Sequence, residues 1–252
     1  MAILSLSTLQ QSDDQKITAG LYGVGGSGKT TFLSTYKDEK DSSVLIFDFD
    51  QKSSGISAIP EKKIIPSGNI NIARYSAQGI AGLPKQFSEW QRDWKTLMRT
   101  GSLHGITPGL VAFDTITTME MLSTAYILSQ KEAHNDKMNQ ADWGSHATFY
   151  NNLFFNTQSL PFHLIFCFHE FVREEGEGIE GRQPLIGGKA ALLRIPSLLQ
   201  EIWWLQQKKD ERILWYKNAP RMAVANSINL TGSGSLKEPT WEGIMKLKKG
   251  SL

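Results

Sequence analysis

The sequence has little cysteine, no long apolar run and almost no excess of charge of one sign. Cys167 is its single cysteine, and a lone cysteine cannot form an internal disulfide, so we expect a packing role in a reducing, cytoplasmic setting. No apolar stretch approaches the ~18 residues of a membrane span, which predicts no membrane association. Residues 1–15 lack the basic and apolar regions of a secretory signal, so we expect none.

Charge alone does not indicate a nucleic-acid partner. The 27 basic and 25 acidic residues leave a formal net charge of +2, whereas a nucleic-acid-binding composition is usually strongly basic. The chain has 252 residues with 40% hydrophobic content and no break in composition. These values predict one globular domain with a sizeable core.

A phosphate-binding loop is the most specific motif in the chain. It matches G-x-x-x-x-G-K-[ST] and lies between an apolar run at 16–22 and a helix-compatible stretch. Its residues are Gly23, Val24, Gly25, Gly26, Ser27, Gly28, Lys29, Thr30 and Thr31. Glycines let successive backbone N–H groups turn toward phosphate oxygens, and the helix start adds its positive dipole. We expect Lys29 on the β- and γ-phosphates and the Thr30 hydroxyl on Mg²⁺.

The same loop also fits the dinucleotide pattern G-x-G-x-x-G through Gly23, Gly25 and Gly28. Acidic residues lie about twenty positions downstream, as a dinucleotide site requires. Lys29 followed by Thr30 decides against that interpretation, because a dinucleotide fold has no use for a lysine in the pyrophosphate turn. The loop therefore predicts a nucleoside-triphosphate site.

Two further apolar strands end in aspartates. The run VLIFDFD at 44–50 places Asp48 and Asp50 on one side of a strand at its carboxyl end, where parallel sheets hold their ligands. The run GLVAFD at 109–114 ends in Asp114. An aspartate at that position holds a Mg²⁺-bound water or the magnesium-binding hydroxyl of the loop.

A fourth apolar strand, 161–168, ends at His169. A polar residue there is well placed to sense a γ-phosphate, and the alternative is a histidine that only caps the strand through a local hydrogen bond. Four strands, each closed by a polar residue, converge on one edge. They predict an α/β fold with a mostly parallel sheet, the core of a nucleoside-triphosphate hydrolase.

The remaining elements follow from periodicity and turn residues. Four apolar residues at helical spacing predict an amphipathic helix that packs on the sheet, in preference to a base-stacking surface: Phe87, Trp90, Trp94 and Leu97. We also expect an edge strand at 70–74, a helix at 145–159, a flexible loop at 171–188, a helix at 190–199 and an edge hairpin of strands at 201–205 and 212–216.

Taken in order, these motifs resemble the RecA-like ATPases, and among them the small, single-domain, phage-type single-strand annealing ATPases. The resemblance covers roughly 16–226 and rests on GVGGSGKTT, VLIFDFD, LVAFDT, HLIFCFHE and GGKAALLRIP. It implies a RecA-like P-loop NTPase fold, with a mostly parallel central sheet flanked by helices and a C-terminal edge hairpin. It also implies ATP and Mg²⁺ as cofactors, ATP hydrolysis, assembly into a ring or filament, and a phage or prophage origin.

The resemblance assigns roles to individual residues. Asp50 becomes the group that orients the attacking water, with Asp48 as the fallback, and His169 becomes the γ-phosphate sensor. Three later cations become candidates for contact with DNA or with a neighbouring subunit's γ-phosphate: Lys189, Arg194 and Arg221. The implied partners are single-stranded DNA, further copies of the chain and a single-strand-binding protein. From patterning and composition we expect an N-terminal arm at 1–15 and a flexible tail at 231–252, on either side of an ATPase domain at 16–230.

Two other functions stay open. The segment 170–182 would correspond to a DNA-contacting loop, yet it carries five glutamates against Arg173 and Arg182, and acidic residues repel phosphates. This charge favours an ATP-gated helicase loader or assembly factor with a protein partner. A P-loop kinase for a small molecule is the other alternative, and the chain shows no arginine-rich lid of the kind that closes over a phosphate acceptor.

Overall fold

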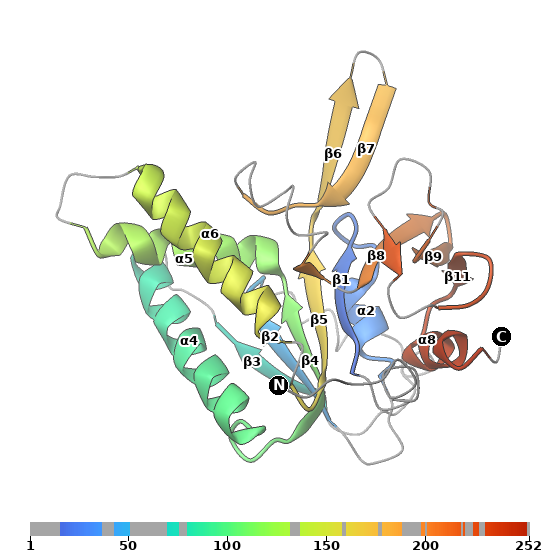
Figure 1. Ribbon diagram of the computed structural model, residues 1–252, viewed down its shortest axis with the longest axis horizontal. Coiled ribbons are helices and arrows are strands. Elements are labelled where there is room, and N and C mark those ends of the chain that lie inside the picture. Colours follow the sequence, from blue (N-terminus) through green and yellow to red (C-terminus); the bar gives the residue numbers. More distant parts are fainter. Residues whose placement is uncertain are drawn as a thin grey trace, which may run out of the picture.

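A nine-stranded sheet organises the chain, in the order β11-β9-β8-β1-β5-β4-β2-β3, with β10 paired to β8 (Figure 1). The strands are β1 (Thr18–Tyr22), β2 (Ser43–Asp48), β3 (Ile70–Arg74), β4 (Pro108–Asp114), β5 (His163–Phe168), β8 (Glu201–Lys208), β9 (Glu211–Trp215), β10 (Ala225–Asn226) and β11 (Ser235–Lys237). From β3 to β8 all neighbours are parallel, while β9, β10 and β11 pair antiparallel. The mostly parallel sheet and its C-terminal hairpin are confirmed.

The computed structural model describes residues 16–36, 43–50, 70–75, 80–131, 137–157, 160–175, 178–187, 198–199, 201–217, 219, 224–226 and 230–250. Its helices are α2 (Lys29–Leu33), η2 (Ile80–Gly82), α4 (Leu83–Thr100), α5 (Ile116–Ser129), α6 (Gln140–Phe155) and α8 (Trp241–Lys248). None of the helices in these ranges combines the length and the apolar character that a bilayer span requires.

Alternate residues of each central strand enter two separate cores. On one face, Phe113 and Phe166 pack with the side chains of α4, α5 and α6. On the other face, Ala112 and Cys167 pack with the side chains of α2 and α8. Figure 1 shows the two groups of helices on opposite sides of the sheet. Because both faces are covered, the strands are continuously apolar, as buried parallel strands are.

The apolar stripe of α4 confirms the packing prediction. Phe87, Trp90, Trp94 and Leu97 are all buried, and the Trp90 and Trp94 rings meet the Phe113 ring at centroid distances of 6.0 and 5.2 Å. Neither tryptophan is available for stacking on a base. Cys167 is also buried within a strand, which agrees with its expected packing role.

The helix expected at 145–159 begins earlier, at Gln140, and ends at Phe155. Asn139 caps it: the Asn139 side chain accepts from the Asp142 N–H, and the Asp142 carboxylate accepts from the Asn139 N–H. This reciprocal capping box satisfies two backbone donors. It starts the helix before Gly144, which the sequence pattern alone placed outside it.

The flexible loop expected at 171–188 is wrong for most of its length. The chain instead forms an antiparallel hairpin of β6 (Glu170–Glu175) and β7 (Gly178–Pro184), which projects from the body in Figure 1. Its base is fixed by Glu170, whose carboxylate accepts from the Trp204 indole N–H at 2.9 Å and pairs with Arg182. The sequences EFVREE and GIEGRQP show no regular alternation of apolar and polar residues, so periodicity alone did not predict these strands.

The flexible tail expected at 231–252 is likewise corrected. Residues 235–237 form β11 at the sheet edge, and α8 buries Trp241, Ile244 and Leu247 against the sheet. Thr240 caps α8 by accepting from the Gly243 N–H at 3.1 Å. The abundant glycine, serine and lysine residues of this segment indicated a flexible tail, although Trp241, Ile244 and Leu247 form an apolar stripe on one side of α8.

Replacing Trp241 by alanine tests the packing of α8. The side chain is 2% exposed and its ring meets those of Phe32, Tyr36 and His163. Its removal should lower the free energy of unfolding by about 3–5 kcal/mol, measured by urea denaturation. Trp143→Ala is the matched control, because Trp143 is 42% exposed. Equal losses in the two variants would show that α8 does not pack as described.

Candidate active site

The phosphate-binding loop leaves β1 at the carboxyl edge of the sheet and enters α2. Gly26 and Gly28 have φ values of 81° and 95°, which are left-handed conformations that favour glycine. Nothing lies within 4 Å of where a Cβ would be on Gly25 or Gly26. The loop is therefore open on the side where a phosphate would bind.

The polar atoms of the loop fit an anionic ligand. The Lys29 ammonium is buried and donates to the Gly23 and Val24 carbonyls at 2.9 and 3.1 Å. The Ser27 hydroxyl is buried without a hydrogen-bond partner among the described residues. Ser27 does not line the cavity beside the loop, whereas Lys29 and the glycines at 25, 26 and 28 do. The donors in this loop therefore fit a polyphosphate.

Thr30 and Asp114 meet across the sheet edge. The Thr30 hydroxyl donates to Asp114 Oδ2 at 2.7 Å, although the two residues are 84 positions apart. Burial raises the pKa of Asp114 above its ordinary value, and the hydrogen bond from Thr30 opposes this increase. A hydroxyl beside a carboxylate suits Mg²⁺, which takes oxygen ligands and completes its shell with phosphates and water. The structure thus brings together the two predicted metal ligands, whose role in binding stays a prediction.

Asp50 lies beside this pair. Its Oδ1 accepts from the Thr115 hydroxyl at 3.1 Å and from the Thr118 hydroxyl, and its Oδ2 is 3.3 Å from His169 Nε2. Asp48, the fallback, instead pairs with Arg74 of the edge strand β3 at 3.3 Å. The geometry favours Asp50 for contact with a ligand.

His169 stands between the site and the projecting hairpin. Its backbone N–H donates to the Thr117 hydroxyl at 3.1 Å, and its carbonyl accepts from Leu185 N–H at 2.8 Å. Thr117 in turn donates to the Leu185 carbonyl at 2.8 Å. The β6–β7 hairpin is therefore tied at its base to His169 and to the first turn of α5.

One cavity of about 220 Å³ joins these groups. Its lining residues are Gly25, Gly26, Gly28, Lys29, Thr30, Thr31, Asp50, Asp114, Thr115, His169 and Arg212. All but Thr115 and Arg212 were predicted as site residues. Sequence reasoning placed Arg212 on a hairpin strand, and only the position of β9 two strands from β1 brings its side chain to the loop. Lys189, Arg194, Arg221 and most of the helix expected at 190–199 lie outside the described residues.

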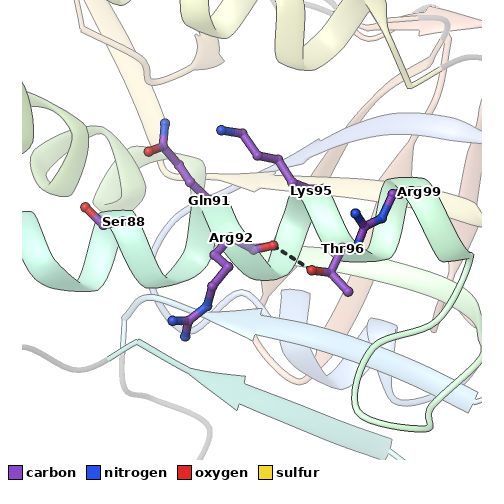
Figure 2. A pocket seen from close by; sticks show the side chains of 6 residues that line it. All are labelled: Ser88, Gln91, Arg92, Lys95, Thr96 and Arg99. Atoms are coloured by element: carbon purple, nitrogen blue, oxygen red, sulfur yellow. Dashed lines mark hydrogen bonds between the residues drawn. The ribbon is translucent and has the colours of Figure 1, made fainter.

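A second cavity, of about 440 Å³, lies against the outer face of α4 (Figure 2). The α4 side chains that line it carry three cations and no acid: Ser88, Gln91, Arg92, Lys95, Thr96 and Arg99. The spacing of three to four residues places the cations along one face of the helix. We call this set of six residues the α4 basic face.

The family model for the AAA domain matches residues 15–226 of the chain. No curated protein sequence matches. One similar solved structure is that of a prototypical ATPase from the type III secretion system of pathogenic bacteria, with a TM-score of 0.42 and 12% identity. That alignment covers 77% of this chain and 52% of the other, so the chain spans about half the length of that ATPase. Because the family model matches most of the sequence, the chain belongs to the AAA-domain family of P-loop ATPases.

Proposed function

We propose that this ATPase uses Mg²⁺ and that its nucleotide state controls assembly on single-stranded DNA. One observation carries the hydrolysis part of the proposal: Asp50 and His169 meet at 3.3 Å in the cavity that also holds Lys29, Thr30 and Asp114. The grouping provides a water-orienting carboxylate, a phosphate-binding cation and a metal-binding pair. These are the parts that phosphoryl transfer to water requires.

The carboxylate of Asp50 is held in place before any ligand binds. Hydroxyls of Thr115 and Thr118 donate to one oxygen, and the second oxygen faces His169. We assign Asp50 the role of orienting the attacking water and accepting its proton. Lys29 is assigned to stabilise the charge that develops on the phosphate oxygens. Mg²⁺ bound by Thr30 and Asp114 would supply further positive charge at those oxygens.

His169 offers a physical route from the nucleotide to the hairpin. In this arrangement its imidazole contacts Asp50, while its backbone holds the base of β6–β7. A γ-phosphate would compete with Asp50 for the imidazole, so the two nucleotide states favour different positions of His169. The hairpin base would then respond to hydrolysis through its bonds to His169 and Thr117.

The α4 basic face provides a surface for the phosphates of DNA. Arg92 is 75% exposed, 3.8 Å from Asp93, and Lys95 and Arg99 are also exposed. Phosphate contacts dominate affinity for nucleic acid. The hairpin is less suited to that contact, because Glu170 and Arg182 neutralise each other at its base and the sequence between them is acidic. The resemblance to single-strand annealing ATPases is the second support for DNA.

A protein partner is the second candidate. The acidic β6–β7 hairpin projects from the body, and its base is bonded to His169 of the nucleotide site. Such an arm would suit contact with a basic protein surface. Under this alternative the chain is an ATP-gated helicase loader or assembly factor. Ionic strength alone does not separate the two candidates, since both contacts would involve charge. The measurement that separates them is the rate of ATP hydrolysis with and without DNA.

Asp50→Asn separates chemistry from binding. The amide keeps the shape of the carboxylate but cannot accept the proton, so hydrolysis should fall about 10²- to 10⁴-fold. The affinity for a non-hydrolysable ATP analogue, measured by titration calorimetry, should change little. Lys29→Ala should lose both hydrolysis and binding. A larger loss of hydrolysis in Asp48→Asn than in Asp50→Asn would contradict the assignment.

Single-stranded DNA should stimulate hydrolysis and bind through the α4 basic face. If Arg92, Lys95 and Arg99 each contact a phosphate, their joint replacement by alanine should reduce the slope of log K against log salt by about 2. Fluorescence anisotropy of a labelled oligonucleotide at several salt concentrations measures this slope.

The control for that experiment removes the same charge elsewhere. Lys208, Lys237 and Lys246 are exposed on β8, β11 and α8, and their joint replacement by alanine should leave the slope nearly unchanged. A wild-type ATPase rate indifferent to single-stranded and duplex DNA would overturn the DNA proposal. Co-purification would then identify the protein partner of the second candidate.

A further inference from the structure

Arg212 is a cation of the nucleotide site that no sequence motif marks. It belongs to β9, two strands from β1, and its side chain lines the same cavity as Lys29 and Thr30. A Cβ placed on Gly28 would lie 2.6 Å from Arg212 Nε and 2.9 Å from its Cδ. The guanidinium stem therefore packs directly against the last glycine of the phosphate-binding loop.

At least one N–H donor of the Arg212 guanidinium is unsatisfied within the described residues. Arg212 Nε is buried and has no hydrogen-bond partner in the part of the chain that the structure describes. Leaving a buried charged donor unpaired is costly, and Lys29 adds a second positive charge to the cavity. A ligand with several anionic oxygens would relieve both costs. Guanidinium groups match phosphate oxygens in charge and in planar geometry.

The backbone of Arg212 is held from the C-terminal side. Its N–H donates to Glu238 Oε1 at 2.9 Å, and the Glu238 N–H donates to its carbonyl at 2.8 Å. Glu238 follows β11, and α8 begins three residues later at Trp241, whose N–H donates to the Thr35 hydroxyl just after α2. The same segment thus holds Arg212 and contacts the helix that the loop enters.

We infer that Arg212 is a phosphate ligand supplied from within the same chain, which binds polyphosphate oxygens together with Lys29. This inference rests on nucleotide binding at the loop and is independent of the DNA proposal. Two other roles are possible for an arginine here: stacking on the nucleotide base, or packing against Gly28 without contact to any ligand. The three roles differ in which ligands they affect.

Titration calorimetry with two probes tests the inference. The probes are a non-hydrolysable ATP analogue and inorganic tripolyphosphate, each with Mg²⁺. Arg212→Ala should weaken both about 10- to 100-fold, the value of a hydrogen bond to a charged group. Arg212→Lys should recover part of the loss, because it restores the charge without the planar fork. Lys208→Ala is the matched control, since it removes an exposed cation from the same hairpin and should change neither affinity.

Two other results would overturn the inference, and each assigns a different role to Arg212. Weaker binding of the ATP analogue with unchanged tripolyphosphate binding would assign Arg212 to the base. Unchanged binding of both probes would leave it a packing residue. Arg212→Gln, which keeps most of the length, and the melting temperature without ligand guard against a folding defect in Arg212→Ala. If the wild-type chain bound neither probe, nucleotide binding itself would fail, and the Lys29→Ala comparison would show no loss.

Discussion

The hydrogen bond between Thr30 and Asp114 is the contact on which the site depends. It joins the first turn of α2 to the end of β4, although β5 lies between β1 and β4 in the sheet. Parallel strands all present their carboxyl ends at one edge, so the same edge also receives Asp50 and His169. The Asp114 carbonyl accepts from Asp50 N–H and Phe49 N–H as well, which fixes the segment after β2 to the segment after β4.

The part of the chain from β8 onward completes this edge from the other side. The β8–β9 hairpin extends the sheet beyond β1 and carries Arg212 to the loop, while β11 and α8 hold that hairpin and cover α2. One segment therefore serves both fold and site: it bonds to Arg212 through Glu238, and it is anchored beside α2 through Trp241. His169 in turn connects the cavity to the base of the projecting β6–β7 hairpin.

The sequence predicted those features whose signal lies within a short stretch of the chain, and most of those that it missed depend on contacts between distant residues. Asp50, Asp114 and His169 each follow an apolar run, and Lys29 belongs to the G-x-x-x-x-G-K-[ST] motif, so local patterns were enough to find them. Arg212 shows no such pattern, and its position depends on which strand neighbours β1. The β6–β7 hairpin was missed because its strands show no regular alternation and its base is held by a contact distant in sequence, Glu170 with Trp204. The helix α8 was missed although Trp241, Ile244 and Leu247 stand at helical spacing, because the surrounding glycine, serine and lysine residues indicated a flexible tail.

A crystal structure with Mg²⁺ and a non-hydrolysable ATP analogue tests most directly whether these residues form one nucleotide site. We expect Mg²⁺ held by the Thr30 hydroxyl and Asp114, phosphate oxygens on Lys29 and Arg212, and Asp50 facing the γ-phosphate. A nucleotide bound elsewhere, or bound in the loop with Asp50 and His169 turned away from it, would contradict the account.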